Sequence, residues 1–572
     1  MNIDNVKILE TIQKYGPLTV RDLYNLLSIN TGKSHKIKAQ IKKLKSRGKI
    51  ITRGGLLQLP RQKSPQKSKV VDRQTLSDDF NDIIGKYKIR KDFPAEVIAE
   101  ANKNFSITPK ELSKRMDFRN QHSITIDGED AKDLDDAVFL EKVSGGWRLY
   151  VHIADVSHYV KLDYALDREA VKRGTSIYLV DKVVPMLPHT LSNGICSLNA
   201  HEDRLCLSAV IDLSSKGIIK NFLFGESVIH VAKRYTYTRV AKVLETPPDK
   251  LEEEDKPFFP MLKEMEKLAL ILIMNRFKNG SIDFDVDELQ IVCDENSNPI
   301  EVRRRERQIS HRIIEEFMLK ANKAAAKFLG DREGAIYRIH DLPDAEKIKT
   351  FFQFMRKLNY NLKETEKVKG TFLQKILNEV KGTKNARVVN TLLLRSMKQA
   401  EYHTDNIGHY GLGFKDYTHF TSPIRRYPDL MVHRLIKQKL GITDKIKKLD
   451  SKKYLAKIAL RCSKNERQAM EAEREIVKIK CARFMKKHLN EKFKGIITGL
   501  AEFGIFVQVA PYGIEGLVRS RDLDGTFTFD EDYYIMRGSK GKNYELGNEI
   551  EVELVSVNVK RGFIDFKVIS TT

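Results

Sequence analysis

The sequence of 572 residues is short of cysteine and has no long hydrophobic run. Its five cysteines are odd in number and form no CxxC pair: Cys196, Cys206, Cys293, Cys462 and Cys481. This pattern speaks against a disulfide framework and a cysteine zinc site, and it favours a reduced, cytoplasmic setting. No apolar run approaches the length of a membrane span, and the polar N-terminus does not resemble a signal peptide. We therefore expect a cytoplasmic protein with no membrane partner.

Acidic residues are fewer than basic residues, and the resulting positive net charge indicates a polyanionic partner. The 101 Lys and Arg residues exceed the 77 Asp and Glu residues, so the formal net charge is +24. Met1–Arg73 alone carry 17 basic and 4 acidic residues, a net charge of +13. Such a charge is typical of proteins that bind nucleic acid or a membrane surface. The length of the chain indicates three or four domains.

Against this basic background, residues 123–140 (SITIDGEDAKDLDDAVFL) form a dense acidic stretch. Ile124 and Ile126 alternate with polar residues, and 137–140 are apolar, so we expect two strands joined by an acidic loop. The loop holds six carboxylates: Asp127, Glu129, Asp130, Asp133, Asp135 and Asp136. Because carboxylates this close repel one another, a hard divalent cation such as Mg²⁺ is expected among them. A solvated loop or a Ca²⁺ loop is the alternative, although the EF-hand spacing is absent.

Residues 1–60 have the pattern of a winged helix-turn-helix. The apolar spacing predicts three helices, the second capped by Thr19 and the third, 36–47, rich in lysine. A hairpin that turns at Gly54-Gly55 follows. The basic third helix favours binding to nucleic acid, with a small protein-interaction domain as the alternative. Residues 61–84 are polar, basic and contain proline, so they are predicted to be a linker.

Residues 85–488 are expected to form one large α+β domain. The apolar pattern predicts a strand over 147–156 and paired strands over 203–212 and 220–229. Long helices are predicted over 263–277 and 310–329, the latter capped by Ser310.

A second stretch with candidate functional residues is 409–434 (HYGLGFKDYTHFTSPIRRYPDLMVHR). Thr421-Ser422-Pro423 predict the capped start of a helix, with Arg425 and Arg426 in its first turn. Two arginines at a helix N-terminus would bind a phosphodiester. The alternative is a structural arginine–aspartate network that uses Asp429.

Residues 489–572 show short strands at regular spacing with glycine turns, which predict a small antiparallel barrel. Phe493, Phe503 and Phe506 lie near basic residues in the sequence and suit stacking on bases. Aromatic residues in small barrels are more often part of the core.

Together these stretches resemble one family, the RNB-domain exoribonucleases ribonuclease II and ribonuclease R, over roughly residues 85–570. The matching motifs occur in the family's order: TIDGEDAKDLDDAV, VHIADVSHYV, RGTSIYLVDKVVPMLP, HRIIEEFMLKAN and HYGLGFKDYTHFTSPIRRYPDLMVHR. The family ends in an S1 barrel, a type of OB-fold, as expected here. The resemblance implies processive, Mg²⁺-dependent hydrolysis of single-stranded RNA from the 3′ end in RNA turnover, with release of nucleoside 5′-monophosphates.

The resemblance also implies roles for individual residues. Asp127, Asp133 and Asp136 would bind metal at a site for two Mg²⁺ ions, and Asp135 would matter most for the chemical step. Arg425 would contact the scissile phosphate, with Arg426 beside it on the RNA. Tyr178 and Tyr337 would flank the terminal base, and Glu473 matches an acidic position of ribonuclease II.

One departure from the family is plain, because no paired cold-shock barrels fit between the N-terminal domain and the RNB domain. The winged helix would take their place. We expect a monomer that acts on single-stranded RNA, and leave open structured RNA, a helicase or the ribosome as partners. The rival hypotheses are a catalytically idle RNA-binding regulator and a DNA-binding transcription factor. The acidic residues, all present with Arg425, disfavour the first, and the metal loop and barrel disfavour the second.

Overall fold

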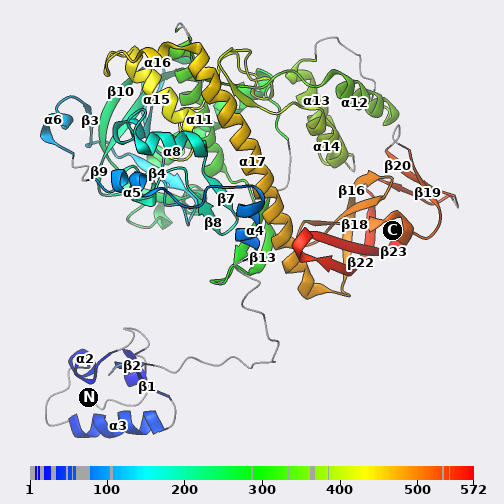
Figure 1. The fold of residues 1–572 in the computed structure, drawn as a ribbon, viewed down its shortest axis with the longest axis horizontal. Helices are drawn as coiled ribbons and strands as arrows, with labels where there is room; N and C mark the ends of the chain where they lie inside the picture. Colours follow the sequence, from blue (N-terminus) through cyan, green and yellow to red (C-terminus); the bar gives the residue numbers. More distant parts are fainter. Residues whose placement is uncertain are drawn as a thin grey trace. The chain divides into compact units, whose positions relative to one another are not determined.

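The computed structural model describes residues 7–9, 11–12, 18–27, 34–46, 49–53, 56–58, 78–103, 107–284, 288–330, 332, 334–360, 368–383, 385–530, 534–539 and 541–571. The chain forms two compact units, Met1–Arg73 and Gln74–Thr572 (Figure 1). Within the described residues, no helix is both long and apolar enough to cross a membrane.

The N-terminal unit contains the second and third predicted helices and the two strands of the predicted hairpin, and residues 7–9 and 11–12 of the first predicted helix are helical. Helix α2 (Val20–Leu26) begins at Thr19, whose hydroxyl accepts from the Asp22 N–H while the Asp22 carboxylate accepts from the Thr19 N–H. Helix α3 spans Ser34–Ser46, and strands β1 (Ile51–Arg53) and β2 (Leu56–Gln58) pair antiparallel. The predicted Gly54-Gly55 turn lies outside the described residues.

Helix α3 separates apolar from basic side chains. Ile37, Ile41 and Leu44 are buried in the core of this unit, because residues at such spacing share one face of a helix. The exposed side of the helix carries Lys38, Lys42, Lys43 and Lys45. This arrangement agrees with a winged helix, which stays a prediction.

The chain enters the second unit earlier than the predicted end of the linker at residue 84. Helix α4 spans Asp78–Lys86, and Ile83 within it is only 1% exposed. Residues 61–77 of the predicted linker lie outside the described residues. A polar composition hid this helix, since only one face of it is apolar.

A seven-stranded mixed sheet forms the centre of the second unit, in the order β11-β4-β5-β6-β9-β10-β3. Its strands are β3 (Met116–Phe118), β4 (Ile124–Asp127), β5 (Asp136–Val143), β6 (Gly146–Ala154), β9 (Asp203–Ser214), β10 (Ile219–His230) and β11 (Lys233–Thr236). The outer pairs β11–β4 and β10–β3 are parallel, and the four pairs between them are antiparallel. The strands predicted from the apolar pattern are therefore present.

Helices α10 (Phe259–Lys278) and α11 (Ile309–Leu329) pack on this sheet. The predicted cap of α11 is wrong: the helix begins after Gln308, and Ser310 lies inside its first turn, fully buried. Helix α15 (Tyr427–Lys439) is buried along most of its length and joins the same core.

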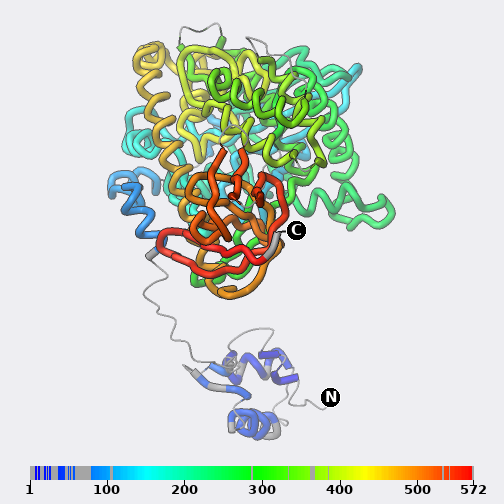
Figure 2. Tube along the Cα trace, turned by 90° about the vertical axis from the view of Figure 1, so that its right-hand side faces the viewer, coloured from blue at the N-terminus to red at the C-terminus, as the bar shows by residue number. Residues whose placement is uncertain are grey.

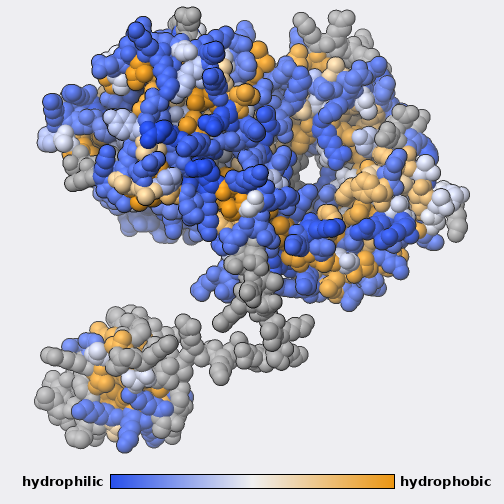
Figure 3. Space-filling model, in the orientation of Figure 1, coloured by the Kyte–Doolittle hydropathy of each residue, from blue (hydrophilic) through white to orange (hydrophobic). Residues whose placement is uncertain are grey.

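Three helices, α12 (Ala345–Lys357), α13 (Gly370–Val380) and α14 (Ala386–Ser396), form a lobe with a core of its own. The 34-residue helix α17 (Lys452–Met485) runs from the body of the unit to the C-terminal barrel (Figure 1). The lobe touches the barrel region, because the Phe354 and Tyr534 rings meet edge to face at 5.9 Å. Figure 2 traces the chain of this unit from α4 in blue to the barrel in orange and red. Figure 3 shows a hollow between this lobe, the barrel and the body of the unit.

The C-terminal region is a closed five-stranded barrel in the order β16-β17-β18-β23-β22. The strands are β16 (Lys492–Ala501), β17 (Gly504–Val509), β18 (Ile514–Arg519), β22 (Glu549–Asn558) and β23 (Phe563–Thr571). The predicted barrel is confirmed. A three-stranded sheet of β19 (Phe527–Asp530), β20 (Ile535–Gly538) and β21 (Asn543–Glu545), which the sequence analysis did not predict, lies between β18 and β22 in the chain.

Candidate active site

The acidic loop joins two neighbouring strands of the central sheet. Asp127 is the last residue of β4, and Asp136 is the first residue of β5. Leu134, between them, is 1% exposed and anchors the loop in the core. The Ser197 hydroxyl accepts from the Leu134 N–H at 3.1 Å and donates to the Lys132 carbonyl at 2.8 Å. The carboxylates are therefore held on a fixed backbone.

A turn just before α15 closes over Asp135. The Ile424 N–H donates to Asp135 Oδ1 at 2.8 Å, and Arg425 Nε lies 3.7 Å from Asp135 Oδ2. The Arg425 carbonyl accepts from the Ser176 N–H at 2.9 Å and from the Thr175 hydroxyl at 3.1 Å. The turn thus joins the Asp135 carboxylate, 289 residues away in sequence, to a segment 250 residues away that holds the Arg425 carbonyl.

The geometry corrects the predicted helix start at 421–423. Helix α15 begins at Tyr427 with Pro428 in its first turn, so Arg425 precedes the helix and Arg426 is its N-cap residue. The Arg425 carbonyl accepts hydrogen bonds from Thr175 and Ser176 instead of from a backbone N–H of a helix. The predicted placement of both arginines in the first turn of a helix is therefore wrong, while their binding to a phosphodiester stays a prediction.

Burial makes ionisation of three aspartates unfavourable. It raises the pKa of Asp127 to about 6, and repulsion by Asp133 adds to this effect. It raises the pKa of Asp136 to about 8, and repulsion by Asp127 adds to that effect. Burial also raises the pKa of Asp135 well above its usual value, although Arg425 and the Ile424 N–H oppose the shift. Such a group of carboxylates is stabilised by an added positive charge.

Tyr178 connects the acidic loop to α17. It lies in β7 (Ile177–Leu179), and its side chain is partly exposed. Its hydroxyl donates to Asp133 Oδ2 at 3.0 Å, and its N–H donates to Glu473 Oε1 at 3.0 Å. The structure therefore brings together Tyr178, Asp133 and Glu473, as the predicted roles require, while those roles stay predictions.

Two other residues predicted to contact RNA are mostly covered by the protein. Arg426 Nη2 donates to Asp429 Oδ1 at 2.7 Å, and the side chain of Asp429 is fully buried. This is the structural arginine–aspartate network named as the alternative, while the side chain of Arg426 stays 17% exposed and its RNA contact stays a prediction. Tyr337, in strand β14 (Tyr337–Ile339), is 6% exposed and belongs to the main core. Its stacking role stays a prediction.

The barrel separates its three predicted aromatic residues. The Phe493 ring lies in the barrel core, which argues against base stacking because a buried ring offers no free face. Phe503 is 58% exposed, and its ring meets the half-buried ring of Phe506 edge to face at 5.9 Å. Of the three, Phe503 suits contact with a base best.

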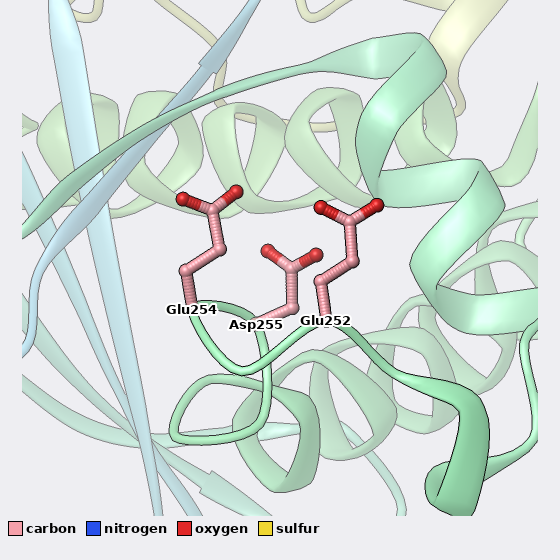
Figure 4. Close-up of side chains that lie close together, drawn as sticks. All are labelled: Glu252, Glu254 and Asp255. Carbon is pink, nitrogen blue, oxygen red and sulfur yellow. The ribbon is translucent and has the colours of Figure 1, made fainter.

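A second acidic group, which the sequence analysis did not single out, consists of Glu252, Glu254 and Asp255 (Figure 4). Their carboxylate oxygens lie within 4.8 Å of one another. Lys233 Nζ lies 2.8 Å from Asp255 Oδ1, and Arg239 Nη2 lies 2.6 Å from Glu252 Oε2 and also pairs with Asp255. This group is already neutralised by the protein's own cations.

The acidic loop fits a divalent cation better. Within the described residues, Asp127 Oδ2 and Asp135 Oδ2 are buried and have no hydrogen-bond partner. Buried acceptors of this kind carry a large desolvation penalty unless a cation or donor compensates them. Oxygen donors are also the ligands that Mg²⁺ prefers. The residues present therefore fit a hard divalent metal.

Sequence reasoning missed the residues that support this loop. Arg234, in β11, donates to the carbonyls of Gly128, Glu129 and Ala131 at 3.3, 3.1 and 2.8 Å. Its charge also lowers the pKa of Asp127, against the larger effect of burial. A single arginine more than 100 residues from the loop gives no local sequence signal; only the parallel pairing of β11 with β4 reveals it.

Comparison with known proteins agrees with this geometry. The model of the RNB domain family matches residues 115–442, and that of the S1 RNA-binding domain matches residues 486–569. Ribonuclease R of Thermotoga maritima is 41% identical over 528 residues, which cover 89% of this chain and 74% of the relative. Ribonuclease R 1 of Lactococcus lactis is 40% identical over 86% of this chain and 60% of its own length.

Solved structures of one relative match the fold. Mycoplasma genitalium RNase R in complex with ribose-methylated single-stranded RNA has a TM-score of 0.81 and 30% identity, over 86% of this chain and 78% of that chain. The same protein with double-stranded RNA has a TM-score of 0.77 and 27% identity, over 91% and 87% of the two chains. The chain belongs to the RNB family of 3′→5′ exoribonucleases that degrade single-stranded RNA. The predicted resemblance is confirmed.

Proposed function

We propose that this chain hydrolyses RNA processively from its 3′ end and releases nucleoside 5′-monophosphates, with Mg²⁺ as cofactor. One observation carries the proposal: two buried carboxylate oxygens, of Asp127 and Asp135, lack a hydrogen-bond partner within the described residues and lie in the site that contains Arg425. A protein that only binds RNA has no need of such an unfavourable group.

Asp127, Asp133 and Asp136 would hold the metal, and the six carboxylates of the loop suit a two-ion site. Bound Mg²⁺ supplies positive charge at the phosphate and lowers the pKa of water bound to it. The protein's part is to hold the carboxylates in place. Ser197 and Leu134 do so for the loop, and Arg234 does so for its carbonyls.

Arg425 would contact the scissile phosphate and stabilise negative charge that develops on its oxygens. Its backbone is fixed by Thr175 and Ser176. Its guanidinium donates from Nη2 to the Ser422 hydroxyl at 3.1 Å and is 42% exposed, so it is accessible to a substrate. Asp135 presents one oxygen to the Ile424 N–H, which leaves the other directed at the site. The orientation of both groups is therefore set before RNA binds.

Tyr178 would stack on the 3′-terminal base, because its ring is exposed while its hydroxyl and N–H are both bonded. Phe503 on the barrel would stack on a base further along the strand. The N-terminal unit would bind nucleic acid through the lysines of α3, as a winged helix does. The complex of the Mycoplasma relative with double-stranded RNA supports structured RNA as a further substrate. A cytoplasmic monomer is our working expectation, and a helicase or the ribosome stays open as a partner.

The test uses a 5′-labelled single-stranded RNA and Mg²⁺, with products separated on a sequencing gel. Wild type should convert the RNA to a short labelled end product, and Asp135→Asn or EDTA should prevent this. Asp130→Asn is the matched control, since Asp130 is an exposed aspartate of the same loop. RNA that is bound but left intact by wild type would refute the enzyme and favour an RNA-binding regulator.

A further inference from the structure

Residues 78–90, here called the brace, precede the RNB match, which begins at residue 115. They lie behind the hairpin of β7 and β8 (Lys182–Val184), which carries Tyr178. Ile83 of the brace is buried in a small core with Leu179 and Val184 of this hairpin. The other buried members of this core come from α17: Ala472, Ile476 and Ile479.

The alternation of strand β7 explains why the brace matters for the site. Ile177 and Leu179 belong to the same small core as Ile83. Because successive side chains of a strand point to opposite faces, Tyr178 between them points away from the brace and toward Asp133. The brace therefore supports the back of the strand whose front carries Tyr178.

Polar contacts tie the brace to α17 beside Glu473. The Tyr87 hydroxyl donates to Glu475 Oε2 at 2.7 Å, and Lys86 pairs with the same carboxylate. The Gln468 side-chain amide donates to the Tyr87 carbonyl. Glu473, between these two α17 positions, accepts the Tyr178 N–H. The brace therefore contacts both the β7–β8 hairpin and helix α17, whose Glu473 binds the Tyr178 N–H.

The end of the brace also reaches the support of Arg425. Arg90 donates to both oxygens of Glu169 at 2.8 and 3.0 Å, and Glu169 accepts from Arg173 at 3.1 Å. Two residues beyond Arg173, the Thr175 hydroxyl donates to the Arg425 carbonyl. A displacement of the brace would therefore disturb the contacts that position Tyr178 and those that position Arg425.

We propose that the brace positions Tyr178 against the 3′-terminal base, with Ile83 and Tyr87 as its positioning residues. This inference rests on the stacking role proposed above for Tyr178. Ile83 acts by filling the space behind Leu179, and Tyr87 acts by tying the brace to Glu475 on the helix that holds the Tyr178 backbone.

The experiment compares two 5′-labelled RNAs that differ only in the 3′-terminal nucleotide, which either carries its base or is abasic. Ile83→Ala and Tyr87→Phe should raise KM about 3- to 10-fold on the RNA with the base, since stacking contributes strongly per base. Neither should change KM on the abasic RNA, where there is no base to stack. Adding either change to Tyr178→Ala should have no further effect on KM.

Two controls separate positioning from general damage. Tyr164→Phe matches Tyr87→Phe at an exposed tyrosine, and Ile376→Ala creates a comparable cavity in α13, where Ile376 is 1% exposed. Neither should distinguish the two RNAs. If the brace variants raise KM equally on both RNAs, the positioning role of the brace is overturned, while the stacking role of Tyr178 is not. If Tyr178→Ala itself fails to distinguish the RNAs, the stacking role and the brace both fall.

Discussion

The two acidic groups of the second unit differ in what neutralises them. Asp255 and Asp135 are similarly buried, at 1% and 4% exposure. Burial acts to raise both pKa values, but Lys233 and Tyr235 outweigh it at Asp255, whose pKa is lowered. At Asp135 the opposing effects of Arg425 and the Ile424 N–H do not outweigh burial, and the pKa is raised.

This difference shows that closeness of carboxylates does not by itself make a metal site. The oxygens of Glu252, Glu254 and Asp255 lie close together (Figure 4). Arg239 and Lys233, however, already pair with these carboxylates, as a bound cation would. The acidic loop has too little positive charge of its own. A binding site is therefore marked by a deficit of compensating charge, which the fold tolerates because a ligand can supply it.

The largest effect is expected from Asp136→Asn. Loss of a metal ligand should lower kcat on single-stranded RNA at least about 100-fold. Glu254→Gln, in the neutralised group, should change kcat less than about twofold, because Glu254 is 65% exposed and distant charges are screened. Comparable losses in the two variants would abolish the distinction between the groups.

Arg425→Lys should come next, with kcat lowered about 10- to 100-fold at a KM changed far less. The lysine keeps the charge near Asp135 but cannot donate to two phosphate oxygens in one plane. Single-turnover rates at saturating enzyme measure this step directly. A variant as fast as wild type would show that charge alone suffices.

The stability of the metal-free protein should depend on pH in the direction set by the raised pKa values. A carboxyl whose folded-state pKa exceeds its unfolded value favours the protonated folded state, so stability falls as pH rises. For Asp127 and Asp136 the window runs from the usual value, 3.8, to about 6 and about 8.

Melting in EDTA should therefore show a loss from this site of about 2 to 5 °C between pH 5 and pH 8. Mg²⁺ should restore Tm at pH 8, and Asp136→Asn should be less sensitive to both pH and Mg²⁺. If wild type and Asp136→Asn show the same pH dependence in EDTA, the site does not hold unfavourable charge.

Asp255→Asn should give the opposite pattern, with reduced stability and retained activity. It leaves Lys233 and Arg239 with less compensation in a partly buried setting, which should lower Tm by about 2 to 4 °C. Its kcat with Mg²⁺ should stay within about twofold of wild type. A rise in the Mg²⁺ requirement would instead link this group to the active site, through Lys233 and its neighbour Arg234.

Local patterns in the sequence predicted much of the fold correctly. Alternation around Ile124 and Ile126 identified β4, and the spacing of Ile37, Ile41 and Leu44 identified α3. The predictions that failed depend on partners distant in sequence. Ser310 resembles a helix cap but is buried in the first turn of α11, and residues 421–423 resemble a helix start but form a turn held by Thr175 and Ser176.

The candidate site divides in the same way. The positions of the loop aspartates and Arg425 could be named from their motifs, because these residues are contiguous in sequence. The brace and Arg234 could not, since neither stands out in composition and both act through contacts with segments far along the chain. Arg426 also could not be separated from Arg425, because only burial against Asp429 distinguishes the two.

The sequence by itself therefore determined the long strands of the central sheet, the barrel, the family resemblance and which carboxylates gather in one loop, since these follow from periodicity and adjacent residues. Only the tertiary structure decided which charges are compensated and which side chains remain accessible. The physical reason is that ionisation and exposure depend on the distance to partners and to water, and folding sets those distances between residues hundreds of positions apart.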